Sequence, residues 1–376
     1  MVLGRGYHAT MGGLLIEAGD LPPRVPLDES VAALVRLVDE FDFAGEGDRS
    51  RALAAFLTPA MRMGGFLPCN VPIDAGEADQ SQSGKGYRHQ LVCEIYREAA
   101  YVVTSRSGGV GSSDESFAAA LVAGRPFVCL DNFRGKMDSQ HLESFLTAPG
   151  LFSARVPCRP EMQIDPRRFL LQLSSNGFQS TADLANRSSI CRIRKRPGYR
   201  YRDTLGELQR RQSYFLGCVF SVITAWIESG KPVTAESRHD FWQWAQPLDW
   251  IVQNILKQAP LMTGHAEAQQ RISDPTLSWL RSIAIVLEAE HRLDQSLLVG
   301  ELVELGALHA VELPGSPRHD DDANAKRHAG RLMARAFDKS DELLVEGYRI
   351  HRSEAMVRRD DDQGTTLSKH YVFHRQ

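Results

Sequence analysis

The fold of this chain is decided by the stretch Asp79-Gln80-Ser81-Gln82-Ser83-Gly84-Lys85-Gly86. Its spacing matches the phosphate-binding loop GxxxxGK(S/T), in which backbone N–H groups and a helix N-terminus surround phosphates while the lysine adds a positive charge. The match is imperfect, because Asp79 replaces the first glycine and Gly86 replaces the hydroxyl residue that normally holds Mg²⁺. The residues that we expect to contact a phosphate-bearing cofactor are Gln80, Ser81, Gln82, Ser83, Gly84, Lys85, Gly86 and Tyr87.

The dipeptide Gly-Lys occurs three times, ending at Lys85, Lys136 and Lys231, so the dipeptide alone identifies nothing. Only Lys85 has a strand-like apolar segment before it, at 65–73, and an amphipathic helical pattern after it, at about 85–99. Lys231 ends a helical pattern and precedes a proline, which is typical of a helix terminus. Context therefore favours the first occurrence as the phosphate loop.

Two further apolar segments end in polar residues. Asp131 and Asn132 follow the segment that starts at residue 127, and Asn176 follows the segment 169–174. In a parallel sheet these ends share the carboxyl edge with the phosphate loop. Asp131 would then hold a metal ion or its waters, and Asn176 would orient the attacking water or contact a γ-phosphate. The alternative interpretation is that each residue is a helix cap or a turn residue.

Strand-like and helical patterns alternate through the middle of the chain. Strands separated by helices imply crossover connections and a largely parallel sheet. We therefore expect an α/β fold with a five-stranded parallel sheet. Its expected strands are 65–73, 100–104, 127–131, 169–174 and 190–193, and the helices among them are 85–99, 114–122 and 137–146.

Four domains are predicted along the chain. Residues 1–60 form a lead-in with two helices, the second of which ends before Thr58-Pro59, and residues 61–203 form the α/β core. The pattern of residues 204–310 predicts long helices, and this range contains all five tryptophans. Residues 311–376 contain a helix followed by a hairpin pattern, which fits a winged-helix domain.

Composition excludes several classes of protein. The chain has 376 residues, 43% hydrophobic and 24% charged, with 44 Lys+Arg against 47 Asp+Glu, so any DNA contact must come from local patches. No apolar run is long enough for a transmembrane helix, and the first residues lack the apolar stretch of a signal peptide. Six scattered cysteines without a CxxC pair indicate free thiols in a reducing, cytoplasmic protein.

Many weak motifs extend from about residue 5 to residue 375. They are Gly6-Tyr7-His8-Ala9-Thr10, Asp42-Phe43, Asp48-Arg49-Ser50, Leu57-Thr58-Pro59, Gly84-Lys85-Gly86, Asp114-Glu115, Asp131-Asn132, Ser175-Asn176, Asp183 through Arg187, and Lys195-Arg196-Pro197. In these motifs the sequence resembles the AAA+ helicase-like ATPases of prophages and integrative elements, near the superfamily-3 and poxvirus-type primase-helicases. Because those proteins share the loop ending GKG, the resemblance accounts for Gly86.

The resemblance implies an AAA+ P-loop core followed by a helical region and a winged helix, with ATP and Mg²⁺ as cofactors. It also implies a ring, often a hexamer, with ATP bound between subunits. Arg187 would be the arginine finger that reaches a neighbour's γ-phosphate, and Arg155 is a second candidate. The alternative for Arg187 is a surface arginine in a basic stretch. Relatives often carry a primase domain, so a separate primase is an expected partner.

The catalytic base is not evident from the sequence. Asn132 stands where many such ATPases have glutamate, and an amide can position water without accepting its proton. Glu115, on a helix before that strand, is a substitute candidate, or a solvated helix residue. Phosphoryl transfer depends mostly on positioning and charge stabilisation, so a missing base does not by itself abolish turnover.

Three residues are candidates for lining a DNA-binding pore, with solvated loops as the alternative interpretation. They are Arg134, Lys136 and Arg155. Tail residues could let a winged helix contact duplex phosphates, although three nearby aspartates, 360–362, argue against a strongly basic wing. These tail residues are Arg331, Arg335, Arg349, Arg352, Arg358, Arg359 and Lys369.

The function that the resemblance implies is an ATP-dependent, ring-forming DNA helicase or translocase that serves replication of a mobile genetic element, acting on single-stranded or forked DNA. The runner-up is a DNA-binding initiator or scaffold with a degenerate nucleotide site that does not hydrolyse ATP, which Asp79, Gly86 and Asn132 favour. A third hypothesis is an antiphage or regulatory ATPase that acts on protein and shows no DNA dependence.

Overall fold

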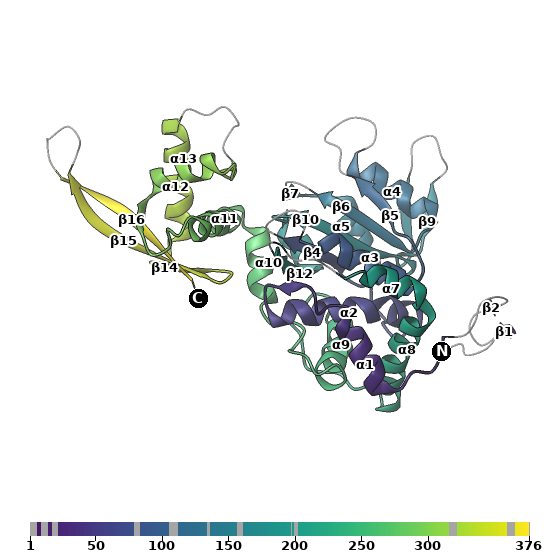
Figure 1. Ribbon diagram of the computed structural model, residues 1–376. Helices are drawn as coiled ribbons and strands as arrows, with labels where there is room; N and C mark the ends of the chain where they lie inside the picture. The colour runs from purple at the N-terminus through teal and green to yellow at the C-terminus, as the bar shows by residue number, and fades with distance from the viewer. Residues whose placement is uncertain are drawn as a thin grey trace. The chain divides into compact units, whose positions relative to one another are not determined.

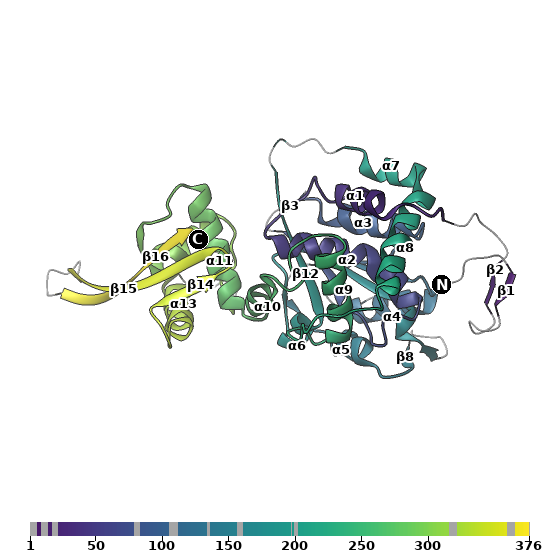
Figure 2. The ribbon, with the colours of Figure 1, turned by 90° about the horizontal axis from the view of Figure 1, so that it is seen from below.

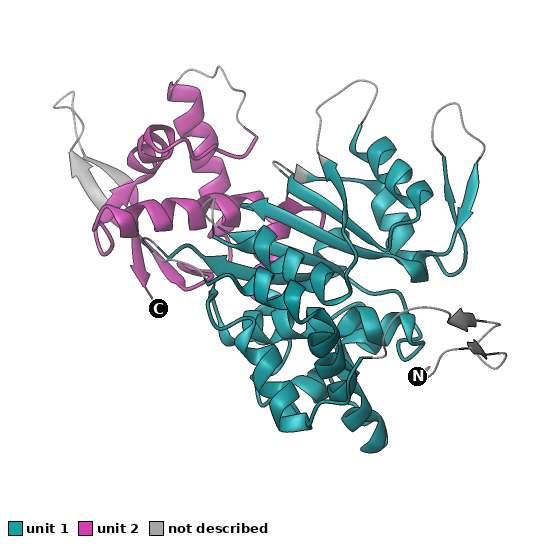
Figure 3. Cartoon of the chain, turned by 45° about the vertical axis from the view of Figure 1, so that its right-hand side comes forward, with its two compact units in different colours: residues 1–178, 183–266 teal, residues 179–182, 267–376 magenta. Residues whose placement is uncertain are grey.

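The structure is a computed structural model of the chain (Figure 1), and it divides into two compact units, coloured separately in Figure 3. Unit 1 comprises residues 1–178 and 183–266, and unit 2 comprises residues 179–182 and 267–376. The residues that the structure describes are 6–8, 14–16, 22–78, 83–104, 112–133, 136–155, 161–196, 198, 202–315, 322–358 and 365–375.

Unit 1 is built on a six-stranded sheet with the strand order β3-β12-β4-β10-β6-β5. Five strands pair in parallel, and the sixth, β3, pairs antiparallel with β12 at one edge. The predicted α/β architecture with a largely parallel sheet is therefore confirmed, with one added strand of two residues, too short to show a periodic pattern. The strands are β3 (Asp42–Phe43), β4 (Ile73–Ala78), β5 (Tyr101–Thr104), β6 (Phe127–Phe133), β10 (Leu170–Asn176) and β12 (Ser188–Arg194).

The strand before the phosphate loop lies later in the sequence than predicted. β4 begins at Ile73, whereas we expected a strand at 65–73. The reason is that β4 is a central strand, bonded on both sides to β10 and β12. Pro68 and Pro72 have no N–H to donate, so the apolar segment that contains them cannot form a central strand.

Unit 1 also contains nine helices in its described residues. The helices α1, α2, α8 and α9 lie beside one another, as Figures 1 and 2 show, and they share an apolar core. Residues 204–254 therefore lie in the same unit as α1 and α2 and share its core. The four predicted domain ranges stay predictions. The bounds are α1 (Leu27–Arg36), α2 (Glu46–Met63), α3 (Lys85–Ile95), α4 (Ser113–Ala123), α5 (Gln140–Thr147), α6 (Ala182–Asn186), α7 (Thr204–Arg210), α8 (Gln212–Glu228) and α9 (Trp242–Asn254).

The helix α2 continues through Pro59, so the prediction that it ends before Thr58 is wrong. A proline inside a helix removes one backbone hydrogen bond. Side chains stabilise this turn instead: Thr58 Oγ1 donates to Ala54 O at 2.9 Å and accepts from Trp244 Nε1 at 3.1 Å. Because the helix is buried along most of its length, apolar packing outweighs the local cost of the proline.

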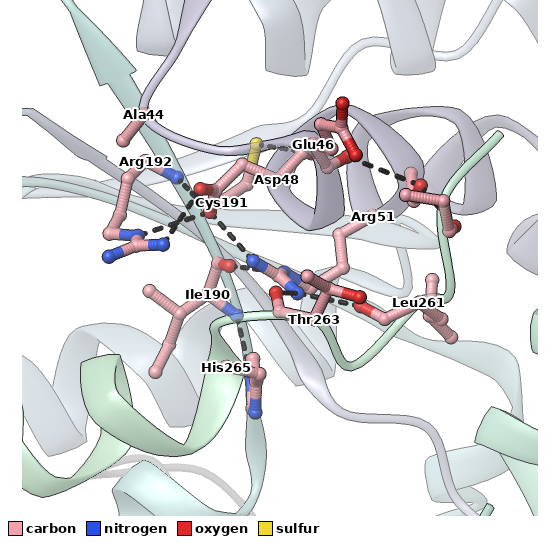
Figure 4. A network of polar contacts seen from close by, with 12 residues as sticks. Ala44, Glu46, Asp48, Arg51, Ile190, Cys191, Arg192, Leu261, Thr263 and His265 are labelled. Carbon is pink, nitrogen blue, oxygen red and sulfur yellow. Dashed lines mark hydrogen bonds and ion pairs between the residues drawn. The ribbon is translucent and has the colours of Figure 1, made fainter.

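A buried ionic network joins α2 to β12 (Figure 4). Asp48 accepts hydrogen bonds from Arg51 Nη2 at 2.8 Å and from Arg192 N and Nη2, each at 2.9 Å. Arg51 also donates to Ile190 O and Leu261 O, at 2.6 Å each. Burial raises the pKa of Asp48, but the two guanidinium groups outweigh burial and hold that pKa below its ordinary value. The network fixes β12 against the helical layer.

Unit 2 combines helices with an antiparallel sheet of order β13-β16-β15-β14. Its core includes Leu280, Ile283, Met333, Phe337 and Phe373, all at most 1% exposed. The predicted helix and hairpin of the tail are present as α13 and β15–β16. The elements are α10 (His265–Ser273), which begins at the unit boundary, α11 (Pro275–Ala289), β13 (Ser296–Leu298), α12 (Val299–Leu308), α13 (Asp322–Ala336), β14 (Glu342–Val345), β15 (Tyr348–Arg358) and β16 (Thr365–Arg375).

Small two-stranded ribbons pair β1 with β2 and β8 with β9, β7 and β11 are further short strands, and a 3₁₀ helix spans Pro166–Arg168. No helix among the described residues has the length and apolar character needed to cross a membrane. The short strands are β1 (Gly6–His8), β2 (Leu14–Ile16), β7 (Lys136–Met137), β8 (Phe152–Ala154), β9 (Met162–Ile164) and β11 (Gln179–Ser180).

Candidate functional site

The described end of the predicted phosphate loop is a glycine followed at once by a helix N-terminus. Gly84 adopts φ 96°, in the left-handed region that favours glycine, and α3 begins at the next residue. The first N–H groups of a helix have no partner within the helix, so those of α3 are available to bind an anion at this point. The predicted contacts of Gln80, Ser81 and Gln82 lie outside the described residues.

Lys85 contacts the end of the neighbouring strand. Its Nζ donates a hydrogen bond to Asn176 Oδ1 over 2.5 Å. The two residues meet because β10 pairs with β4, with Asn176 opposite Ala78. Lys85 is only 9% exposed, and burial lowers its pKa although Asp131 and Glu77 act to raise it. A partly desolvated ammonium group interacts more strongly with an anion than a solvated one does.

Asp131 lies at the same edge of the sheet, where a residue of β10 hydrogen-bonds to it. Ser174 Oγ donates to Asp131 Oδ1 at 2.6 Å and accepts from Asn132 N at 2.8 Å. The carboxylate is exposed, so it retains free acceptor positions for a metal ion or its waters. Asn132 adopts φ 49°, a left-handed conformation that asparagine accepts more readily than most residues do.

The chemistry of these residues fits a nucleotide with its Mg²⁺. A helix N-terminus, a buried lysine, a carboxylate and an amide converge at the carboxyl edge of β4, β6 and β10. Ser83 Oγ is buried without a hydrogen-bond partner among the described residues. Such a hydroxyl group carries a desolvation cost that a phosphate oxygen or a water would remove. The orphaned hydroxyl is the observation that favours a phosphate ligand.

Gly86 and Tyr87 differ in what surrounds them. A Cβ atom added to Gly86 would meet no heavy atom within 4 Å, so the position has room for the hydroxyl side chain that it lacks. The Tyr87 hydroxyl accepts a hydrogen bond from Leu205 N at 2.7 Å, and its ring lies 6.3 Å from that of Phe41. Tyr87 therefore connects α3 to α7, and its predicted contact with the nucleotide stays a prediction.

Arg187 lies at the opposite edge of the sheet. It immediately precedes β12, whose first residue, Ser188, pairs with Ile73 at the amino end of β4. Six residues of strand span roughly 20 Å, which separates this edge from the phosphate loop. The guanidinium group is 19% exposed and lies 3.6 Å from Asp183. Within one chain the structure thus does not bring Arg187 to Lys85.

The other predicted residues lie elsewhere or are not described. Arg155 is exposed directly after β8, and the backbone of Lys136 forms part of β7. Arg134 lies outside the described residues, as does the side chain of Lys136. Glu115 lies in the first turn of α4, where its N–H donates to Ser112 Oγ at 3.3 Å. The roles predicted for these residues stay predictions.

Sequence reasoning missed buried polar residues that support the site. Glu77 is 2% exposed, and its Oε1 accepts from Phe178 N at 3.1 Å, which fixes the turn after Asn176. Arg88 forms a bidentate pair with Asp74, at 3.0 and 2.6 Å, which fixes α3 to β4. The available signal was two carboxylates next to the loop, since a charge in a central strand is costly unless it is paired.

No protein-family model matches this chain, and no curated protein matches it. Among solved structures, the chain is similar to the apo A form of the NrS-1 C-terminal region (305–718), at TM-score 0.36 and 11% identity, over 71% of this chain and 56% of that one. A second NrS-1 C-terminal region structure gives TM-score 0.34 and 12% identity, over 91% and 78%. SCCmec type IV Cch, described as an active helicase, gives 0.35 and 11%, over 94% and 72%.

Proposed function

We propose that this chain is a ring-forming ATPase that moves on or unwinds DNA as a helicase or translocase of a mobile genetic element. The single observation that carries the nucleotide site is the contact between Lys85 and Asn176 beside the N-terminus of α3. Lys85 and the loop amides would hold the β- and γ-phosphates, and Asp131 would hold Mg²⁺ through its free oxygens. ATP, when bound, supplies the phosphoryl group that is transferred to water.

Lys85 and Asn176 act together in this proposal. In the structure the ammonium group donates to the Asn176 amide oxygen. A phosphate oxygen is a stronger acceptor for an ammonium group than a neutral amide is, so Lys85 exchanges one partner for the other. Asn176 is then released to orient the attacking water. The exchange links phosphate binding at the loop to the contacts of Asn176, the last residue of β10.

The proposed site has an amide, and not a carboxylate, next to the attacking water. Asn132 follows Asp131 and is exposed, so its amide can position a water molecule but cannot take its proton. Charge stabilisation by Lys85 and the metal still lowers the barrier, because phosphoryl transfer needs little base catalysis. We therefore expect slow rather than absent turnover.

The proposed ring gives Arg187 a role between subunits. An arginine finger stabilises charge on the transferred phosphoryl group, and Arg187 lies at the wrong edge of the sheet to do so within its own chain. It can take this role only in a neighbouring subunit, after its pair with Asp183 opens. DNA, further copies of the chain and a separate primase are the partners that we propose.

Steady-state ATP hydrolysis with and without single-stranded DNA tests this function, with Lys85→Ala as the blank. DNA-stimulated turnover that the variant lacks would support a motor, whereas equal turnover in both proteins would overturn the site. A second candidate is the initiator or scaffold that binds ATP without hydrolysis, which the missing hydroxyl at Gly86 and the amide at Asn132 favour. ATP binding with no turnover above the blank would select it.

A further inference from the structure

The helix α13 carries an exposed row of three arginines. Arg327, Arg331 and Arg335 are spaced four residues apart, and all three are exposed. This spacing places them on one face of the helix over about 12 Å. The opposite face is buried, with Ala329 and Met333 at 0% exposure. The helix is thus fixed in unit 2 by its apolar face and presents the arginine row, which we call the α13 stripe, to solvent.

The α13 stripe has no carboxylate partner among the described residues. In the same unit, Lys326 pairs with Glu304 at 2.6 Å and with Asp322 at 2.9 Å. The sheet arginines of this unit whose side chains are described are also paired, as in the contact of Arg352 with Asp341 at 2.6 Å. For the stripe, the one described side-chain bond is from Arg327 Nε to Ala323 O, which leaves the positive charge uncompensated.

The local charge contrasts with that of the chain. The helix holds four Lys or Arg residues and one acidic residue, whereas the whole chain has a formal charge of −3. Unpaired arginines on a rigid face bind phosphates well, because the guanidinium group offers several donors in a fixed geometry. A regular row of phosphates is therefore the ligand that this surface fits.

Duplex nucleic acid fits the stripe better than a single strand does. Proteins that bind single strands combine basic residues with aromatic side chains on which bases stack. The stripe has no aromatic residue, and the histidine of α13, His328, is bonded to Pro314 O at 2.7 Å. Phosphate contacts alone suit a duplex, whose backbone is regular and whose bases are already stacked.

We propose that the α13 stripe binds the phosphate backbone of duplex DNA without reading its sequence. This inference rests on the proposed function and deepens it by naming a surface that holds duplex DNA. It differs from the sequence prediction, which also included Arg349 and Arg352, because the structure pairs these two with Glu342 and Asp341.

The test measures DNA binding as a function of salt without ATP, in the Lys85→Ala chain, so that ATPase failure does not affect the result. The stripe variant is Arg327→Gln/Arg331→Gln/Arg335→Gln. Its matched control is Arg24→Gln/Arg125→Gln/Arg168→Gln, which removes the same charge from three exposed arginines of unit 1. A third variant, with lysine at the three stripe positions, retains the charge. Melting curves should be unchanged, because the substituted side chains are exposed.

We expect the stripe variant to bind duplex DNA roughly tenfold more weakly or worse, and to lower the salt slope by about 2.7, since each phosphate contact contributes about 0.9. The control and the lysine variant should retain most of the slope. Three results would each overturn the proposal. They are an equal loss of affinity in the control, an unchanged salt slope in the stripe variant, and a larger loss of affinity for single-stranded than for duplex DNA. Failure of duplex DNA to bind the unsubstituted chain would also overturn it.

Discussion

Lys85 Nζ lies 2.5 Å from Asn176 Oδ1, so the first residue of α3 donates a hydrogen bond to the last residue of β10. The two residues are 91 positions apart in the sequence and meet at the carboxyl edge of the sheet. In the proposed function this contact holds the lysine until a phosphate replaces the amide. The contact thereby links nucleotide binding to the position of Asn176, the residue proposed to orient the attacking water.

Substitution of Asn176 should separate binding from turnover. In Asn176→Ala, Lys85 loses its protein acceptor but keeps its charge, so ATP affinity should be retained or increase. Turnover should fall by about 10²-fold, the size of effect seen when one oriented transition-state group is removed. Equilibrium nucleotide binding and steady-state hydrolysis measure the two effects. The exposed Asn254→Ala is the control, and a parallel loss of affinity and turnover would contradict the prediction.

Gly86 offers a test of the missing metal ligand. The variant Gly86→Ser adds a hydroxyl group in open space next to Lys85, where a typical phosphate loop has one. We expect turnover to rise and less Mg²⁺ to be needed for half-maximal activity. Replacing a helical glycine should also stabilise α3 by about 0.5 kcal/mol. Gly330→Ser, another open helical position, is the matched control, and reduced ATP affinity in Gly86→Ser would contradict a metal at this position.

Asn132 tests the role of a base. Asn132→Glu places a proton acceptor directly after Asp131, and general bases commonly contribute 10²-fold or more. We expect faster hydrolysis in this variant, together with a loss of about 1 kcal/mol in stability because φ at this residue is 49°. Single-turnover hydrolysis and urea unfolding measure the two changes. A rate equal to that of the unsubstituted chain, with binding intact, would place water activation elsewhere.

Arg187 predicts complementation between inactive chains. Arg187→Ala should bind ATP normally yet turn it over at least tenfold more slowly, because the finger acts in trans. Mixing Arg187→Ala with Lys85→Ala should restore part of the activity, since some interfaces then contain an intact loop and an intact finger. The exposed Arg167→Ala is the control. Activity of each mixture equal to the average of its two components would rule out a trans role.

Buried histidines make stability depend on pH. His239 is 1% exposed, its Nδ1 accepts from Phe241 N at 3.0 Å, and burial lowers its pKa from 6.5 to about 4. Between these values the unfolded chain binds a proton that the folded chain does not, so the stability present above pH 6.5 falls as the pH drops toward 4. The loss is about 3 kcal/mol for this residue.

Urea unfolding of the unsubstituted chain and of His239→Gln between pH 7 and 5 measures this contribution. The variant should be less stable at pH 7, because the buried ring is lost. The difference between the two proteins should narrow as the pH falls. The exposed His351→Gln is the control for loss of an imidazole group. A constant difference across this range would mean that His239 titrates normally in the folded protein.

The local sequence pattern predicted the phosphate loop and the alternation of strands and helices. The spacing of Gly84 and Lys85, the helix after them, and the alternation of strands and helices are set by neighbouring residues, so they can be read without the fold. The polar ends of two strands, Asp131 and Asn176, are visible for the same reason. Boundaries could not be predicted in the same way. Prolines kept the apolar segment before Ile73 out of β4, whereas Pro59 did not end α2, because buried packing dominates there.

Strand order was decided only by the tertiary structure. Because β10 lies between β4 and β6, Asn176 contacts Lys85 and Ser174 contacts Asp131. Because β12 runs parallel to β4, Arg187, which precedes β12, lies at the amino edge of the sheet. No sequence spacing specifies these contacts, because residues far apart in the chain pair through backbone hydrogen bonds and shared burial. The unpaired state of the α13 stripe is of the same kind, since it depends on where the folded chain places its carboxylates.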